Sequence, residues 1–197
     1  MSDPLDTVRA YHQRTKHQFR RFAAGNMKKS FQDSMPGKDL AQTLRQTRHL
    51  ANDFIDQVAA EIVATSPRVV GCASSNQQNC AALSILKRVR QLDDSVVTIL
   101  GGANCEGPMG LGLRRAFPWV DFVVSGEAEE IFPGLLQTLF RHGRGVDEDL
   151  LPECVIGASR AAALEPSSPR RAVVCDLEAS ALPDYGDYFE QLSRSGL

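Results

Sequence analysis

Three consecutive stretches of this chain repeat one pattern: an apolar strand, a polar or glycine-rich turn, and an amphipathic helix. The strands are predicted at residues 68–73, 96–100 and 121–125, and the helices that follow them at 78–92, 109–117 and 129–141. Strands rich in valine and isoleucine that alternate with helices form a parallel sheet covered on both faces, with right-handed crossovers. The pattern therefore predicts a doubly wound, Rossmann- or flavodoxin-like α/β domain.

A longer helix is predicted before the first of these strands. Asp39 followed by Gln42 is a capping signal, and the helix is expected to end near Pro67. Its apolar face is predicted at Leu40, Leu44, Ala51, Phe54, Ile55, Val58 and Ile62. This helix opens the α/β domain, which we place at residues 39–181.

Residues 1–38 differ in charge from the rest of the chain. They carry 8 Lys and Arg against 3 Asp and Glu, whereas the remaining residues carry 14 against 21. Apolar residues with helical spacing, from Val8 to Phe22, predict a basic amphipathic helix. Residues 25–39 are rich in turn-forming residues and predict a linker. Residues 1–38 are therefore expected to be a helical extension that suits an acidic partner, an anionic surface or the acidic body of its own domain.

The C-terminal part of the chain has weaker sequence signals for secondary structure. Residues 153–156 and 172–175 are predicted to be short strands that form a hairpin at the sheet edge. The Ala-, Pro- and Ser-rich stretch between them, residues 158–171, is predicted to be a flexible loop. Residues 182–197 show no clear period and are treated as a separate tail.

Composition and motifs exclude several classes of function. The net charge of -2 provides no general field for nucleic acid. Apolar runs fall well short of the roughly 20 residues that a membrane span needs, and no signal peptide is evident, so a cytoplasmic protein is expected. The five cysteines and four histidines lack the spacing of a zinc or iron–sulfur site. We therefore expect no protein-built metal site and no catalytic residue.

The turns after the three strands are the expected binding site, because ligands of doubly wound sheets bind outside the carboxyl ends of the strands. Each turn alone is ordinary turn or capping chemistry. Together, and without a GxGxxG fingerprint or a Walker lysine, they predict a shallow platform for a large planar or polar ligand. The predicted binding residues are Ser74, Ser75, Asn76, Gln77, Gly101, Gly102, Ala103, Asn104, Gly126 and Glu127.

Four segments resemble the cobalamin-binding domain of radical S-adenosylmethionine (SAM) enzymes that mature ribosomally made peptides. In chain order they are VVGCASSNQQNCAALSILKRVR, TILGGANCEGPMG, VDFVVSGEAEEIFPGLL and LPDYGDYFEQL, and the resemblance covers about residues 54–192. It implies that the strand-end loops hold cobalamin. It also implies a following barrel with a 4Fe-4S cluster and SAM, and methylation of carbon in a peptide.

The chain departs from this family in three respects. It has no CxxxCxxC motif and it ends at Leu197, where the family enters its barrel, so we expect no iron–sulfur cluster in this chain and no catalysis by it alone. The family's opening strand is not recognisable in residues 1–38, which leaves open whether the sheet has its first strand. DxHxxG is absent as well, so cobalt would have water, Asn76 or Gln77, or nothing beneath it.

Two main classes of function remain, beside a third alternative, an ordinary nucleotide-binding flavodoxin-like domain. The first is a cobalamin-binding module that serves a separately encoded radical SAM C-methyltransferase barrel, or that self-associates, with a precursor peptide as a further partner. The second is a cofactor-free interaction or remnant protein of a peptide natural-product pathway. The string from Tyr11 to Ala23, which resembles the first helix of peptide azoline dehydrogenases, fits that pathway context under either reading.

Overall fold

The structure is a computed structural model that describes residues 40–165, 169–176, 178 and 184–195. The chain divides into two units, Met1–Asp53 and Phe54–Leu197. The described part of the first unit is the beginning of helix α3. The predicted basic helix, the linker at 25–39 and the boundary at residue 38 lie outside the described residues and stay predictions.

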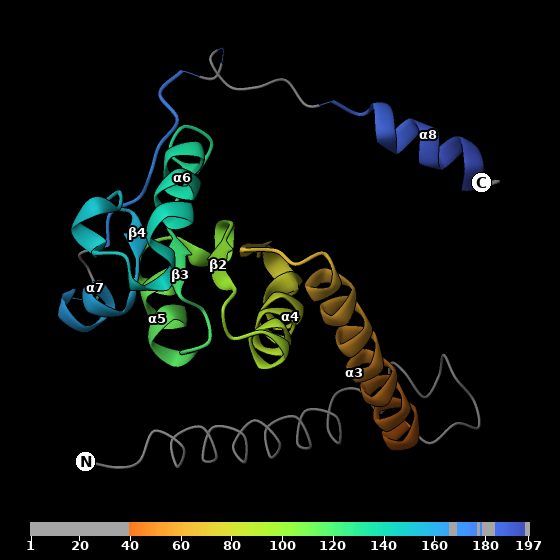
Figure 1. The fold of residues 1–197 in the computed structure, drawn as a ribbon. Coiled ribbons are helices and arrows are strands. Elements are labelled where there is room, and N and C mark those ends of the chain that lie inside the picture. Colours follow the sequence, from red (N-terminus) through yellow and green to blue (C-terminus); the bar gives the residue numbers. More distant parts are fainter. Residues whose placement is uncertain (1–39, 166–168, 177, 179–183, 196–197) are drawn as a thin grey trace, which may run out of the picture. The chain divides into compact units, whose positions relative to one another are not determined.

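Within the described residues, four strands form one sheet in the order β1-β2-β3-β4 (Figure 1). The strands are β1 (Val69–Ala73), β2 (Val97–Gly101), β3 (Phe122–Val124) and β4 (Val155–Ile156). The first three are parallel, whereas β4 runs antiparallel to β3. The predicted α/β fold class and all three predicted parallel strands are confirmed, each strand within a residue or two of its expected bounds.

Helices follow the three parallel strands as the sequence predicts. They are α4 (Asn79–Leu92), α5 (Pro108–Ala116) and α6 (Phe132–His142), preceded in the chain by α3 (Leu40–Ala64). α6 begins three residues later than expected, because residues 128–131 form a turn before it. It ends at Gly143, whose φ of 64° is readily adopted by glycine. In the described segments no helix combines the length and apolarity needed to cross a membrane.

The two faces of the sheet have separate cores. On one face Val70, Leu100 and Val123 pack with buried residues of α4, α5 and the end of α3. On the other face Ile99 and Val124 pack with buried residues of α6. Figure 1 shows α6 on the opposite side of the sheet from α4 and α5. Alternate residues of each strand therefore serve opposite cores, as a sheet covered on both faces requires.

The apolar face of α3 is narrower than predicted. Ile55, Val58 and Ile62 are partly buried and Ala59 is fully buried, which is the spacing of one helix face. Phe54, which we assigned to that face, is 61% exposed. Phe54 lies at the margin of the packed stripe, about 40° around the helix from Val58 and about 100° from Ile55.

Three expectations for the C-terminal part are wrong. β4 pairs with β3, while Ala172 forms an isolated parallel bridge with Gly126, so in the described residues the two segments do not form the predicted hairpin. The predicted flexible loop contains a short helix, α7 (Ala158–Ala163). The tail contains a helix, α8 (Gly186–Ser195), and Tyr185, directly before it, has the i, i+3, i+4, i+7 spacing with Tyr188, Phe189 and Leu192 that is typical of a helix.

β1 is an edge strand in the described part of the chain. It pairs with β2 on one side, and Gly71 and Ala73 are exposed on the face that α6 covers elsewhere. β2, by contrast, is buried almost throughout. This open edge agrees with the absence of a recognisable opening strand from the sequence.

Candidate functional site

The loops after β1, β2 and β3 meet at one edge of the sheet, as predicted from the parallel topology. The first loop is tied to β2, because the backbone N–H of Ser74 donates to the carbonyl oxygen of Gly101 at 2.7 Å. The second is tied back to the first, because the N–H of Asn104 donates to the carbonyl of Ser74 at 3.0 Å. The third joins through Ser125, whose hydroxyl accepts from the N–H of Gly107 at 2.9 Å.

Asn104 is the centre of the polar network between the first two loops. Its amide nitrogen Nδ2 donates to the Ser74 hydroxyl at 2.9 Å and to the carbonyl of Asn76 at 3.1 Å. The Ser74 hydroxyl in turn donates to Oδ1 of Asn79 at 3.1 Å. Ser74 is fully buried, so its hydroxyl is satisfied within the chain. Ser74 and Asn104, both predicted to hold a ligand, therefore also fix the shape of the loops.

Gly102 allows two backbones to approach each other closely. Its φ of 92° and ψ of 179° lie in a region that is essentially reserved for glycine. A Cβ atom placed there would lie 2.7 Å from the carbonyl oxygen of Ser74. The sequence predicts a close approach at this glycine, and in the structure the neighbour that approaches it is the first loop.

The third loop holds a strap formed by residues 169–176. The Ala172 N–H donates to the carbonyl of Ser125 at 2.9 Å, and the Glu127 N–H donates to the carbonyl of Ala172 at 3.0 Å. The carboxylate of Glu127 also accepts from the Val174 N–H at 2.7 Å. Gly126 lies beneath the strap, and a Cβ atom there would come within 2.3 Å of the Ala172 carbonyl oxygen.

Arg171 of the strap and Glu106 of the second loop are charged residues that the sequence did not single out, and they help to connect the strap to the loops. Arg171 forms ion pairs with Glu106 of the second loop, at 3.1 Å, and with Glu127 of the third, at 3.7 Å. All three side chains are roughly half exposed. Arg171 lies in the stretch that we expected to be a flexible loop, so no local pattern marked it as a partner of these carboxylates.

Asn76, Gln77, Ala103 and Glu127 are the predicted site residues that are exposed at this edge, and of these Glu127 is already bound to the strap. Ser75 is half-buried, and its N–H donates to the side chain of Gln78 at 3.0 Å. Asn76 has a φ of 48°, an uncommon conformation for a residue other than glycine. The carbonyl of Asn76 is held by Asn104, whereas no interaction of the Asn76 or Gln77 side-chain amides occurs with the described residues. Among the predicted site residues, these two side-chain amides are hydrogen-bonding groups without a partner in the described residues.

The cysteines of the described residues are spread through the unit. Cys105, in the second loop, is fully buried, and burial raises the pKa of its thiol to about 11. Burial also raises the thiol pKa of Cys72 and of Cys154. These thiols are therefore protonated at neutral pH and poor metal ligands. In the segments that the structure describes, no three His, Cys, Asp or Glu side chains gather as a metal site would require.

Comparison with known proteins gives one informative match. The chain is 29% identical over 140 residues to an anaerobic magnesium-protoporphyrin IX monomethyl ester cyclase from Rubrivivax gelatinosus. The match covers 70% of this chain and 24% of the cyclase. No family model matches the chain, and no solved structure matches it.

The match supports a relationship to part of a larger enzyme. The chain spans about a quarter of the cyclase it matches, 24% of its length. The cyclase, by its name, acts on a cyclic tetrapyrrole. Most of this chain therefore has a counterpart in one segment of that enzyme, while the activity of the whole cyclase does not transfer from so short a segment.

Proposed function

We propose that the α/β unit binds cobalamin at the edge formed by its three strand-end loops and acts within a radical SAM-related system. The proposal is carried by the order QQN, GGANCEG and SGE, which fall on the three loops that the fold brings to one edge. The relationship to an enzyme named for a tetrapyrrole substrate supports a ligand of this class, because the corrin of cobalamin is also a cyclic tetrapyrrole.

The residues at the edge fit such a ligand in part. The side chains of Asn76 and Gln77 and the exposed Ala103 are available to a broad polar macrocycle. Ser74, Asn104 and Gly102 hold the loops in place instead. When bound, cobalamin supplies a cobalt centre that can carry a methyl group. The chain's own residues would bind the macrocycle and hold the backbone amides of the three loops in position beside it.

Binding of hydroxocobalamin tests the proposal. The purified full chain is incubated with the cofactor, separated by gel filtration and examined by absorption spectroscopy. We expect stoichiometric co-elution and a shifted cobalt spectrum. Neither co-elution nor a spectral shift, from a chain whose circular dichroism shows it to be folded, would contradict the proposal.

A matched pair of variants locates the binding. The side-chain amides of Asn76 and Gln77 are exposed and have no partner among the described residues, and glycine readily adopts the positive φ of Asn76. N76G/Q77A is therefore expected to leave the fold intact and to weaken binding by about tenfold, the effect of losing one or two good hydrogen bonds. Gln137→Ala is the control, because Gln137 is also an exposed glutamine but lies on α6, away from the first loop. Equal affinity of all three proteins would move the site away from the first loop.

A porphyrin tested in the same assay distinguishes binding of cobalamin from binding of other tetrapyrroles. Zinc protoporphyrin IX is offered in the same assay, alone and in competition with hydroxocobalamin. We expect cobalamin to bind more tightly. Tight porphyrin binding without cobalamin binding would keep the ligand class and reject cobalamin.

The reaction that the bound cofactor would serve is a further part of the proposal. We infer that the bound cofactor serves a radical SAM barrel that methylates a peptide. The resemblance to peptide-maturing enzymes supports this context. Reconstitution with a candidate barrel and a precursor peptide tests it, and methyl transfer that does not depend on this chain would contradict it.

A cofactor-free interaction protein is the second candidate, and α8 favours it. Tyr188 and Phe189 of that helix are 60% and 62% exposed, and Tyr185, directly before it, is 60% exposed. Aromatic side chains clustered in this way are characteristic of interfaces. We expect removal of residues 182–197 to abolish self-association or partner capture in light scattering. Unchanged assembly with a lowered melting temperature would make α8 a structural element.

A further inference from the structure

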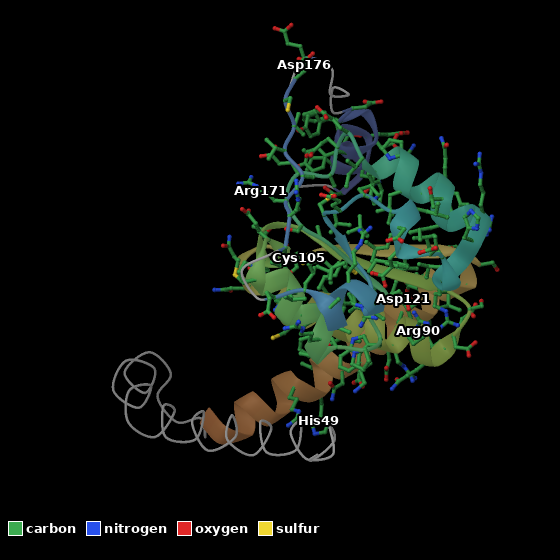
Figure 2. All side chains as sticks on the ribbon, turned by 90° about the vertical axis from the view of Figure 1, so that its left-hand side faces the viewer. His49, Arg90, Cys105, Asp121, Arg171 and Asp176 are labelled. Atoms are coloured by element: carbon green, nitrogen blue, oxygen red, sulfur yellow. The ribbon has the colours of Figure 1, made fainter. Side chains whose placement is uncertain are left out.

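A cavity lies at the opposite edge of the sheet from the strand-end loops, beside the start of β3. It has a volume of about 350 Å³, near the lower end of small-molecule sites. Asp121, which directly precedes β3, and Ser159, near the start of α7, are among its lining residues. Figure 2 labels Asp121 with Arg90 well away from Arg171, which belongs to the loop edge. The cavity is therefore independent of the proposed cobalamin site.

The two carboxylates in the wall of this cavity already have partners. Oδ2 of Asp121 pairs with the Arg90 guanidinium and accepts from the Thr98 N–H at 2.8 Å. The Glu148 carboxylate accepts the backbone N–H groups of Gly157, Ser159 and Arg160 at 3.1, 2.7 and 3.0 Å. These contacts compensate both negative charges, and Glu148 occupies the amides at the start of α7.

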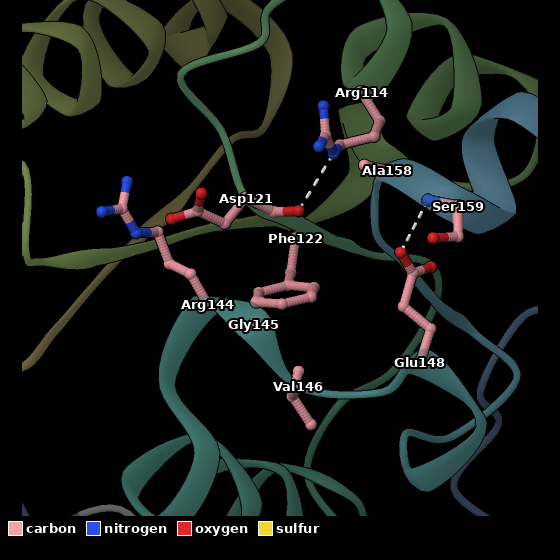
Figure 3. A pocket seen from close by; sticks show the side chains of 9 residues that line it. All are labelled: Arg114, Asp121, Phe122, Arg144, Gly145, Val146, Glu148, Ala158 and Ser159. Atoms are coloured by element: carbon pink, nitrogen blue, oxygen red, sulfur yellow. Dashed lines mark hydrogen bonds between the residues drawn. The ribbon is translucent and has the colours of Figure 1, made fainter.

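The two guanidinium groups in the wall keep nitrogens that make no hydrogen bond. Arg114 donates through Nε to the backbone carbonyl of Asp121 at 2.9 Å, and its terminal nitrogens have no hydrogen-bond partner among the described residues. Burial lowers the pKa of Arg114 and the nearby charges of Asp121 and Glu148 act in the opposite direction, so this arginine stays charged at neutral pH. Arg144 has no interaction with any described residue. Figure 3 shows the two guanidinium groups on either side of Asp121.

The cavity also has an apolar side. Phe122 and Val146 line it, both of them buried side chains of the second core. In Figure 3 the Phe122 ring lies between Asp121 and Val146. A ligand at this position would meet the small accessible part of these two side chains, which are 3% and 7% exposed, together with two planar cations. Guanidinium groups recognise planar or tetrahedral oxyanions through paired hydrogen bonds.

We propose that this cavity binds a small oxyanion carried on an apolar body, a phosphate monoester or a carboxylate, through Arg114 and Arg144. The site gives the α/β unit a second ligand, unrelated to the loop edge. Neither the proposed cofactor nor its partner barrel is needed for it.

Calorimetric titration of the full chain tests the proposal with three probes: inorganic phosphate, phenyl phosphate and benzoate. Sodium chloride of matched ionic strength is the reference. We expect binding at millimolar concentration or better, with phenyl phosphate tighter than inorganic phosphate because its ring can contact Phe122. Preference between phenyl phosphate and benzoate identifies the oxyanion. No heat above the chloride reference for any probe would overturn the site.

Charge reversal at Arg144 locates the binding. Arg144 is exposed and makes no contact that folding needs, so R144E is expected to fold normally and to lose at least about tenfold in affinity. Arg141→Glu makes the same charge change on an exposed arginine of α6 outside the cavity. Equal affinity of the two variants would show a general charge effect and overturn the assignment.

Discussion

Gly102 shows how a single residue can hold two loops together. Its backbone conformation excludes a side chain, and so does Ser74, whose carbonyl oxygen would lie 2.7 Å from a Cβ atom there, whereas a Cβ atom on Gly71 would have open space around it. Gly102→Ala is expected to lower the free energy of unfolding by at least about 2 kcal/mol, from backbone strain and displaced neighbours. Gly71→Ala should raise it by up to about 1 kcal/mol, because a strand interior disfavours glycine.

Chemical denaturation of both variants measures these effects. The pair is informative because the substitution is the same and only the surroundings differ. A small effect at Gly102, equal to that at Gly71, would mean that the two loops are not held as closely as the structure has them.

The Cys105 thiol makes the free energy of unfolding depend on pH in the alkaline range. Its folded-state pKa of about 11 lies above the ordinary value of 9.0, so the folded protein holds this proton more tightly than the unfolded chain does. The associated stability is fully present below pH 9 and is lost as the pH rises toward 11. Relative to C105A, the wild type is expected to lose about 2 kcal/mol between pH 8 and pH 10.5.

Denaturation curves of wild type and C105A over that pH range provide the measurement. Because other thiols also titrate there, the difference between the two proteins is the informative quantity. A difference that stays constant with pH would show that the Cys105 thiol is not desolvated.

At the scale of elements, the strap is the part most easily released. Its contacts to Glu127 are exposed, and ion pairs of that kind contribute little to global stability. Glu127→Ala is therefore expected to change the free energy of unfolding by less than about 1 kcal/mol. It should nevertheless speed hydrogen exchange at Val174, whose N–H the carboxylate accepts.

Glu129→Ala is the matched control, because Glu129 is exposed in the same loop and touches no described residue. Exchange is followed by mass spectrometry over residues 169–176. Equal exchange in both variants would mean that Glu127 does not hold the strap.

The elements also show what the sequence could and could not predict. The three strands and α4, α5 and α6 were predictable, because periodicity and local turn chemistry specify them. α8 was missed although Tyr185, Tyr188 and Phe189 have helical spacing, because the polar and turn-forming residues around them obscured it. The bridge between Gly126 and Ala172 depends on a long-range contact that no local pattern encodes.

The candidate site was predictable to the same extent. Parallel topology brings Ser74, Gly102 and Ser125 to one edge, and that much follows from the order of strands and turns. Their internal hydrogen bonds, and the roles of Glu106 and Arg171, do not. Local sequence indicates which residues meet, whereas the division between loop-building and free side chains depends on atomic packing.

For the molecule as a whole, the central claim is that a cofactor occupies the edge where the three loops meet. That edge is formed by residues 74–78, 101–107 and 125–130, and the oxyanion cavity lies at the opposite edge. A ligand at the loop edge should protect the first two loops from hydrogen exchange and leave the region around Arg144 unchanged.

Hydrogen–deuterium exchange of the full chain, with and without saturating hydroxocobalamin, is the most direct measurement of this claim. We predict slower exchange confined to residues 74–78 and 101–107. Exchange in the strap at 169–176 should be unchanged, or faster if the ligand displaces the strap. Identical exchange with and without hydroxocobalamin, or protection that falls only outside the three loops, would contradict it.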